Sequence, residues 1–128
     1  MYGPAGSTHQ YLDTQIQASS AVERIVLLFE AALRAIADAQ DGFERGDIAA
    51  RGAAISKALA VVTELQCSLD LEQGGDIANE LDRLYHWMTS RLVDATTQQT
   101  SQPLEEVRKV LLILADGWRT VATRQEGP

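Results

Sequence analysis

Apolar residues recur at helical spacing in four stretches of this chain. The clearest stretch begins after Asp76, where apolar side chains return every three or four positions from Ile77 to Leu92. This spacing places them on one face of an α-helix. The same period predicts helices over about 21–43, 48–69, 77–95 and 103–121. The side chains expected to point inward are Val22, Ile25, Phe29, Ala32, Leu33, Ile36 and Phe43; Ile48, Ile55, Ala58, Leu59, Val62, Leu65 and Leu69; Ile77, Leu81, Leu84, Tyr85, Met88 and Leu92; and Leu104, Val107, Leu111, Leu114, Trp118 and Val121.

Glycines and capping residues separate the expected helices. Gly46 ends the first helix and Asp47 caps the second, while Gly74-Gly75 stops the second and Asp76 caps the third. The polar run 96–101 forms the third loop, and Pro103 suits the first positions of a fourth helix. Short reversals make neighbouring helices antiparallel, so the sequence predicts an all-α, up-down-up-down four-helix bundle.

The first 20 residues are expected to form a separate N-terminal arm or cap. Ser20 and Glu23 have the spacing of a capping box, which predicts that the first helix starts at residue 21. Upstream, Tyr11, Leu12 and Ile16 form an apolar edge too short to fold alone. The expected organisation is therefore an arm over 1–20, a bundle over 21–124 and a disordered tail over 125–128.

Composition supports one helical domain and excludes several classes of partner. Hydrophobic residues make up 45% of the 128-residue chain but aromatic residues only 5%, a balance that favours helices over sheets. The net charge of −7 disfavours nucleic acids and anionic membrane surfaces, which attract basic proteins. A lone Cys67 permits no internal disulfide, and the sequence lacks a secretory signal or membrane-spanning run. A cytoplasmic protein is expected.

Some apolar residues remain outside the inward faces. Leu27 lies nearly opposite the first helix's inward face, and a second stripe of Leu28, Ala31, Ala35 and Ala39 lies beside that face. Leu112 and Ile113 also fall outside the inward face of the fourth helix. Such surplus apolar surface is typical of an interface, although alanine is also simply the best helix former. Dimerisation, capping by the arm and binding of a client protein all remain open.

The sequence offers little support for a catalytic site. A di-iron bundle needs inward Glu-x-x-His pairs, and none occurs here. Ser, Asp and His are too scattered for a catalytic triad, and Gly74-Gly75 does not have the context of a phosphate-binding loop. We therefore expect no catalytic residue, metal or cofactor. The alternative is a histidine phosphotransfer bundle using His86, which lies opposite the inward face of the third helix.

The chain resembles the bacterial flagellin export chaperones, the FliS family, over nearly its whole length. The segments that carry the resemblance are 1–2 with Tyr11, Gln15 and Ile16; 25–33; 56–58, 64–65 and 68–70; 74–78 with Leu81, Leu84, Tyr85, Met88 and 91–92; and 105–107 with 115–118. Glu30-Ala31 replaces the acidic-glycine pair that is common in that family. The resemblance implies a four-helix bundle with an N-terminal arm that folds back near the client groove.

The resemblance also implies a function that needs no catalytic group. Such a chaperone binds the disordered C-terminal segment of flagellin, prevents its polymerisation in the cytosol and delivers it to the flagellar export apparatus. The surplus apolar stripes suit this task, because a disordered client wraps a large surface as it folds. The candidate partner-binding residues are Tyr11, Ile16, Leu27, Leu28, Ala31, Ala35, Leu112 and Ile113.

Overall fold

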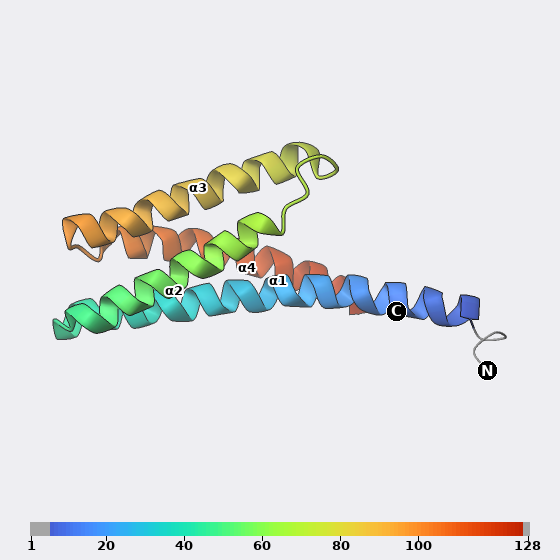
Figure 1. Ribbon diagram of the computed structural model, residues 1–128, viewed down its shortest axis with the longest axis horizontal. Helices are drawn as coiled ribbons and strands as arrows, with labels where there is room; N and C mark the ends of the chain where they lie inside the picture. Colours follow the sequence, from blue (N-terminus) through green and yellow to red (C-terminus); the bar gives the residue numbers. More distant parts are fainter. Residues whose placement is uncertain (1–5, 127–128) are drawn as a thin grey trace.

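The chain folds as four helices that reverse direction at each turn (Figure 1). A computed structural model describes the backbone of residues 6–126 and the side chains of residues 21–124. The helices are α1 (Gly6–Arg45), α2 (Ile48–Cys67), α3 (Gly75–Gln98) and α4 (Gln102–Glu126). Residues 6–126 contain no strand. The predicted all-α bundle is confirmed.

The longest helix, α1, packs against two partners. Within the described residues, α1 contacts α2 and α4, while α3 contacts α2 and α4 (Figure 1). The helices therefore form a closed ring in the order α1, α2, α3, α4. We call the end with the turns at 46–47 and 99–101 the two-turn end, and the end with the loop at 68–74 the single-loop end.

The expected start of the first helix is wrong. The helix begins at Gly6 rather than after Ser20, because no Gly or Pro interrupts residues 7–20 and serine only mildly disfavours helix. The side chains of Tyr11, Leu12 and Ile16 lie outside the described residues. Their role as partner contacts therefore stays a prediction, as does the division into arm, bundle and tail.

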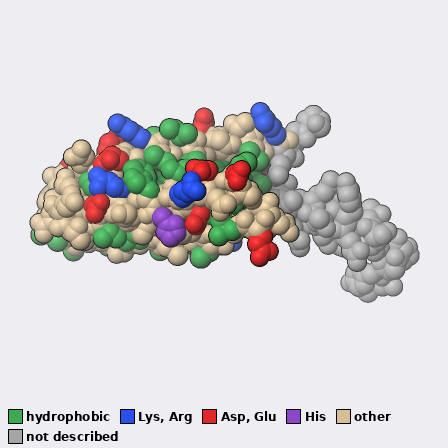
Figure 2. All heavy atoms as spheres, turned by 90° about the horizontal axis from the view of Figure 1, so that it is seen from above, with side chains coloured by type: hydrophobic (Ala, Val, Ile, Leu, Met, Phe, Trp, Pro, Cys, Tyr) green, Lys and Arg blue, Asp and Glu red, His purple; other side chains and the backbone are tan. Residues whose placement is uncertain are grey.

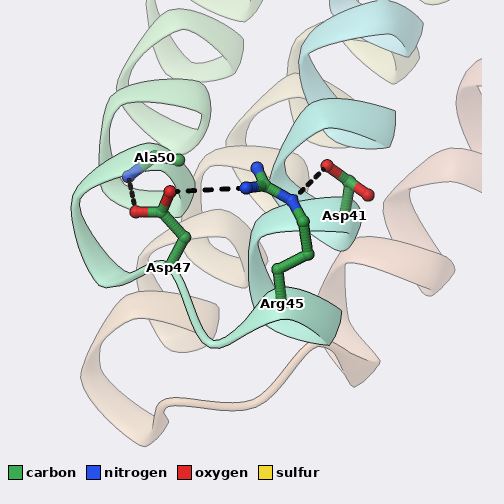
Figure 3. Close-up of polar contacts among 4 residues, drawn as sticks. All are labelled: Asp41, Arg45, Asp47 and Ala50. Carbon is green, nitrogen blue, oxygen red and sulfur yellow. Dashed lines mark hydrogen bonds and ion pairs between the residues drawn. The ribbon is translucent and has the colours of Figure 1, made fainter.

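The turn between α1 and α2 is fixed by the residues that predicted it (Figure 3). Gly46 has φ +66°, a left-handed conformation that a glycine adopts without a Cβ clash. Asp47 is the N-cap of α2, and its Oδ1 accepts a hydrogen bond of 3.0 Å from the backbone N–H of Ala50. Arg45 joins the two helices, with Nε 2.8 Å from Asp41 Oδ2 and Nη1 3.5 Å from Asp47 Oδ2.

The loop between α2 and α3 differs slightly from expectation. Gly74 occupies the N-cap position of α3 and Gly75 has φ +57°, so Asp76 lies in the first turn rather than at the cap. An acidic side chain in the first turn still interacts favourably with the helix dipole. Within the loop, Oδ1 of Asp70 accepts a 3.0 Å hydrogen bond from the backbone N–H of Gln73.

The core follows the predicted stripes except near helix ends. Ile48 is 71% exposed and Ile77 is 75% exposed, and Val121 is also exposed. Each lies in the first turn or toward the end of its helix, where neighbouring helices no longer cover it. Leu84 is only half-buried and lies outside the core cluster. The buried cluster is Phe29, Ala32, Ala35, Ile36, Ala39, Ala54, Ile55, Ala58, Val62, Leu65, Tyr85, Met88, Leu92, Ala95, Leu104, Val107, Leu111 and Ala115.

The alanine stripe of α1 is a packing face, not a free surface. Ala35 and Ala39 are buried, so Ala35 is not exposed to a partner in this structure, and its role in partner binding stays a prediction. Gly42 continues the same face, and a Cβ built on it would lie 2.8 Å from the Cβ of Arg51 in α2. The two backbones therefore approach closely here. Helix α1 carries a second apolar stripe because it packs against α2 as well as α4.

Polar side chains connect the helices near the two-turn end. Nε2 of Gln40 in α1 donates a 2.9 Å hydrogen bond to Glu105 in α4. Arg108 also binds Glu105, with its Nη2 2.6 Å from Oε1. The hydrogen bonds from Arg108 and then from Gln40 lower the pKa of the Glu105 carboxyl to about 2. Arg91 links α3 to Glu106 of α4.

Leu111→Ala should lower the free energy of unfolding by about 2–5 kcal/mol, because it leaves a cavity at a fully buried site. Leu84→Ala, at a half-buried site outside the core cluster, should cost clearly less. Urea unfolding of both variants measures the difference. Equal losses would show that the core is not centred where the structure places it.

Glu105 should make stability depend on acid. Its pKa is 4.5 ordinarily and about 2 in the folded chain. Its stabilising contribution is thus complete above about pH 4.5 and is lost as the pH falls toward about 2. Unfolding free energies measured between about pH 5 and pH 2 should fall less steeply for Glu105→Gln than for the wild type. Parallel curves would contradict this role.

Candidate partner-binding grooves

An apolar groove lies between α3 and α4 toward the single-loop end. It encloses about 330 Å³ and exposes side chains from the first half of α3 and the second half of α4. We call it the α3–α4 groove, and its lining residues are Ile77, Leu81, Ile113, Leu114, Gly117, Trp118 and Val121. Ile77 is 75% exposed and Ile113 is 72% exposed, so large aliphatic side chains face water on both walls.

The lining residues on each wall of the groove have helical spacing. On α4, Ile113, Gly117 and Val121 recur every four residues and follow one row along the helix. On α3, Ile77 and Leu81 have the same spacing. Farther along the same pair of helices, the ion pair between Arg91 and Glu106 joins α3 to α4. The groove therefore opens toward the single-loop end.

A second hollow continues this groove beneath the loop between α2 and α3. It encloses about 320 Å³ and shares Ile77, Leu81 and Trp118 with the α3–α4 groove. Tyr85 lies at its buried side, and burial raises the pKa of the Tyr85 hydroxyl to about 12. The further lining residues are Ile25, Ser68, Leu69, Asp70, Gly74 and Ala78. Together the two hollows form a continuous, largely apolar surface.

Another groove lies on the opposite flank of α4, against α1. It encloses about 430 Å³ and is lined by Glu23, Val26, Leu27, Arg119, Ala122 and Thr123. We call it the α1–α4 groove. Leu27 is 61% exposed there. The charged rim includes Arg119, whose Nε lies 4.0 Å from Oε1 of Glu30.

The structure separates the predicted partner-binding residues into different places. Leu27 lies in the α1–α4 groove and Ile113 in the α3–α4 groove. Leu112 is 40% exposed but lines neither groove. Leu28 and Ala31 are half-buried on α1.

Five groove residues were predicted to point inward: Ile77, Leu81, Leu114, Trp118 and Val121. Leu81, Leu114 and Trp118 are partly buried and pack against the core, whereas Ile77 and Val121 are exposed. The sequence feature that distinguishes Ile77 and Val121 is their position near helix ends, beside the two-glycine loop and toward the C-terminus of α4.

His86 forms a surface contact between α2 and α3. Its Nε2 lies 2.8 Å from Nε2 of Gln66 and 3.6 Å from Oδ2 of Asp82. The Gln66 amide also donates a 3.0 Å hydrogen bond to Oδ1 of Asp82. These contacts hold the imidazole against neighbouring side chains. Figure 2 shows a face of the molecule on which acidic, basic and apolar side chains are interspersed.

Among the described residues, no three His, Cys, Asp or Glu side chains are grouped as metal ligands. The described helices also include none with the length and apolar character needed to cross a bilayer.

Charged substitutions should distinguish groove from core. Leu27→Asp and Ile113→Asp, at exposed positions, should change the free energy of unfolding by no more than about 0.5 kcal/mol. Ala35→Asp should unfold the chain or cost several kcal/mol, about 3 or more, because it buries an unpaired charge. Circular dichroism melts of the three variants make the comparison. A stable Ala35→Asp variant would refute the packing of α1 on α2.

Comparison with known proteins identifies the family. The sequence model of the family described as "Flagellar protein FliS" matches residues 4–125. The chain is 36% identical over 107 residues to the flagellar secretion chaperone FliSB of Pseudomonas aeruginosa, covering 84% of this chain and 85% of that protein. It is 33% identical over 114 residues to the flagellar secretion chaperone FliS of Salmonella typhimurium, covering 88% and 84% respectively.

A more distant relative, FliS of Vibrio cholerae, is 28% identical over 107 residues and also covers most of both chains. The matched region includes all of the groove residues on α1, α3 and α4. The chain therefore belongs to the FliS family of flagellar secretion chaperones.

Proposed function

We propose that this chaperone binds the disordered C-terminal segment of flagellin in the α3–α4 and α1–α4 grooves. Binding there prevents flagellin from polymerising in the cytoplasm until the complex reaches the flagellar export apparatus. Membership of the FliS family supports a role as a chaperone of flagellar secretion. The grooves supply a surface of the right chemistry for the client.

The observation that carries the proposal is the exposure of large aliphatic side chains beside a filled core. Leu111 and its neighbours are fully buried, so Ile77, Ile113 and Leu27 are not needed to complete the core. Each exposed apolar square ångström that a partner covers contributes about 25 cal/mol. A protein that keeps three such residues in grooves gains this contribution only when a partner binds.

The positions of the grooves suit a client that wraps around the chaperone. One groove lies on each flank of α4, so a single flexible segment crossing α4 contacts both. A disordered segment spends part of its binding energy on becoming ordered, which keeps affinity moderate for the area buried. Moderate affinity allows release at the export apparatus. Tyr11 and Ile16 remain proposed contacts near the N-terminus.

The function needs no chemical reaction, so no catalytic residue or cofactor is assigned. The phosphotransfer alternative with His86 draws no support from the family, and Gln66 and Asp82 already contact this imidazole.

Ile113→Asp should weaken the binding of a flagellin C-terminal peptide by about tenfold or more, because it places a charge in the α3–α4 groove. Ile48→Asp is the matched control: Ile48 is 71% exposed against 72% for Ile113, yet it lies at the two-turn end. Isothermal titration calorimetry with both variants tests the proposal. Equal affinities for wild type and Ile113→Asp would remove the α3–α4 groove from it. Absence of wild-type binding would refute the proposal altogether.

A further inference from the structure

Gly117 lies inside α4, at a position where neither helix packing nor backbone conformation requires a glycine. Glycine disfavours helix relative to alanine because it loses more backbone freedom on folding. A Cβ built on Gly117 meets no atom of the described residues within 4 Å, and its φ is not positive. At Gly42, by contrast, an added Cβ would lie 2.8 Å from the Cβ of Arg51. Packing between helices explains Gly42 but not Gly117.

The position of Gly117 in the α3–α4 groove gives it a different context. It lies midway along the row from Ile113 to Val121, four residues from each. Ile113 is 72% exposed and Val121 is also exposed, so two aliphatic side chains flank a position that has no side chain. The row therefore contains an apolar gap, with Trp118 beside it among the lining residues.

We infer that Gly117 is a specificity-determining position, at which the gap between Ile113 and Val121 receives one large apolar side chain of the client segment. This inference rests on the proposed function and specifies the chemistry of one contact. A side chain seated in the gap contacts aliphatic groups on both sides, and the lack of a Cβ lets the client approach the backbone of α4. Any side chain at residue 117 would compete with the client for that volume.

Gly52 offers a matched control for the helix effect alone. It also lies inside a helix, α2, and a Cβ built on it likewise meets no described atom within 4 Å. Gly52 lines neither groove. Open space around a glycine is thus common to both positions, and only Gly117 combines it with an apolar surface.

The test measures stability and client affinity in the same four full-length proteins: wild type, Gly117→Ala, Gly117→Leu and Gly52→Ala. The probe is a synthetic peptide with the C-terminal segment of a flagellin from the same genome. All three variants should melt at or above the wild-type temperature, because each replaces a helical glycine with a better helix former. Gly52→Ala should bind the peptide as the wild type does.

Gly117→Leu should bind at least about tenfold more weakly, and Gly117→Ala should show a smaller loss in the same direction. Replacing the apolar residues of the peptide one at a time by alanine should then reveal one whose effect is large in wild type and lost in Gly117→Leu. Wild-type affinity in Gly117→Leu would overturn the inference while leaving the proposed function intact. Failure of the wild type to bind the peptide would refute both.

Discussion

The structure depends on the packing of α1 against two helices at once. A helix with one partner needs one apolar stripe, whereas α1 contacts both α2 and α4 and carries two. Toward α2 the contact is made through small residues, Ala35, Ala39 and Gly42, which let the backbones approach until an added Cβ at Gly42 would strike Arg51. Because little side-chain volume separates these helices, their spacing tolerates little change.

The two ends of the bundle have different chemistry. Near the two-turn end, Gln40 and Arg108 bind Glu105, and Arg91 binds Glu106, so polar contacts join α1, α3 and α4. Toward the single-loop end the same helices expose apolar grooves. The fully buried core and the most exposed groove residues, Ile77 and Ile113, are thus different residues, although Leu81, Leu114 and Trp118 contact both core and groove.

Exposed apolar surface carries a risk of self-association, which the charge of the chain opposes. The net charge of −7 makes copies of the chain repel one another at long range. The exposed apolar side chains are also divided between two flanks of α4, so they do not form one broad patch.

Local patterns in the sequence predicted four helices, most of their turns and the centre of the core, although not the start of α1. Apolar spacing predicted Phe29, Val62 and Leu111 as buried, and Gly46 with Asp47 predicted the first turn, because helical period and capping are local properties. Which apolar residues remain exposed depends instead on how the helices pack. Ala35 is buried because a second helix covers it, whereas Ile77 and Val121 have inward phase but lie where neighbouring helices end. A periodic pattern fixes the direction of a side chain around its own helix. It does not fix how far along that helix the neighbours extend, and this extent decides whether a residue of inward phase, such as Ile77, is covered.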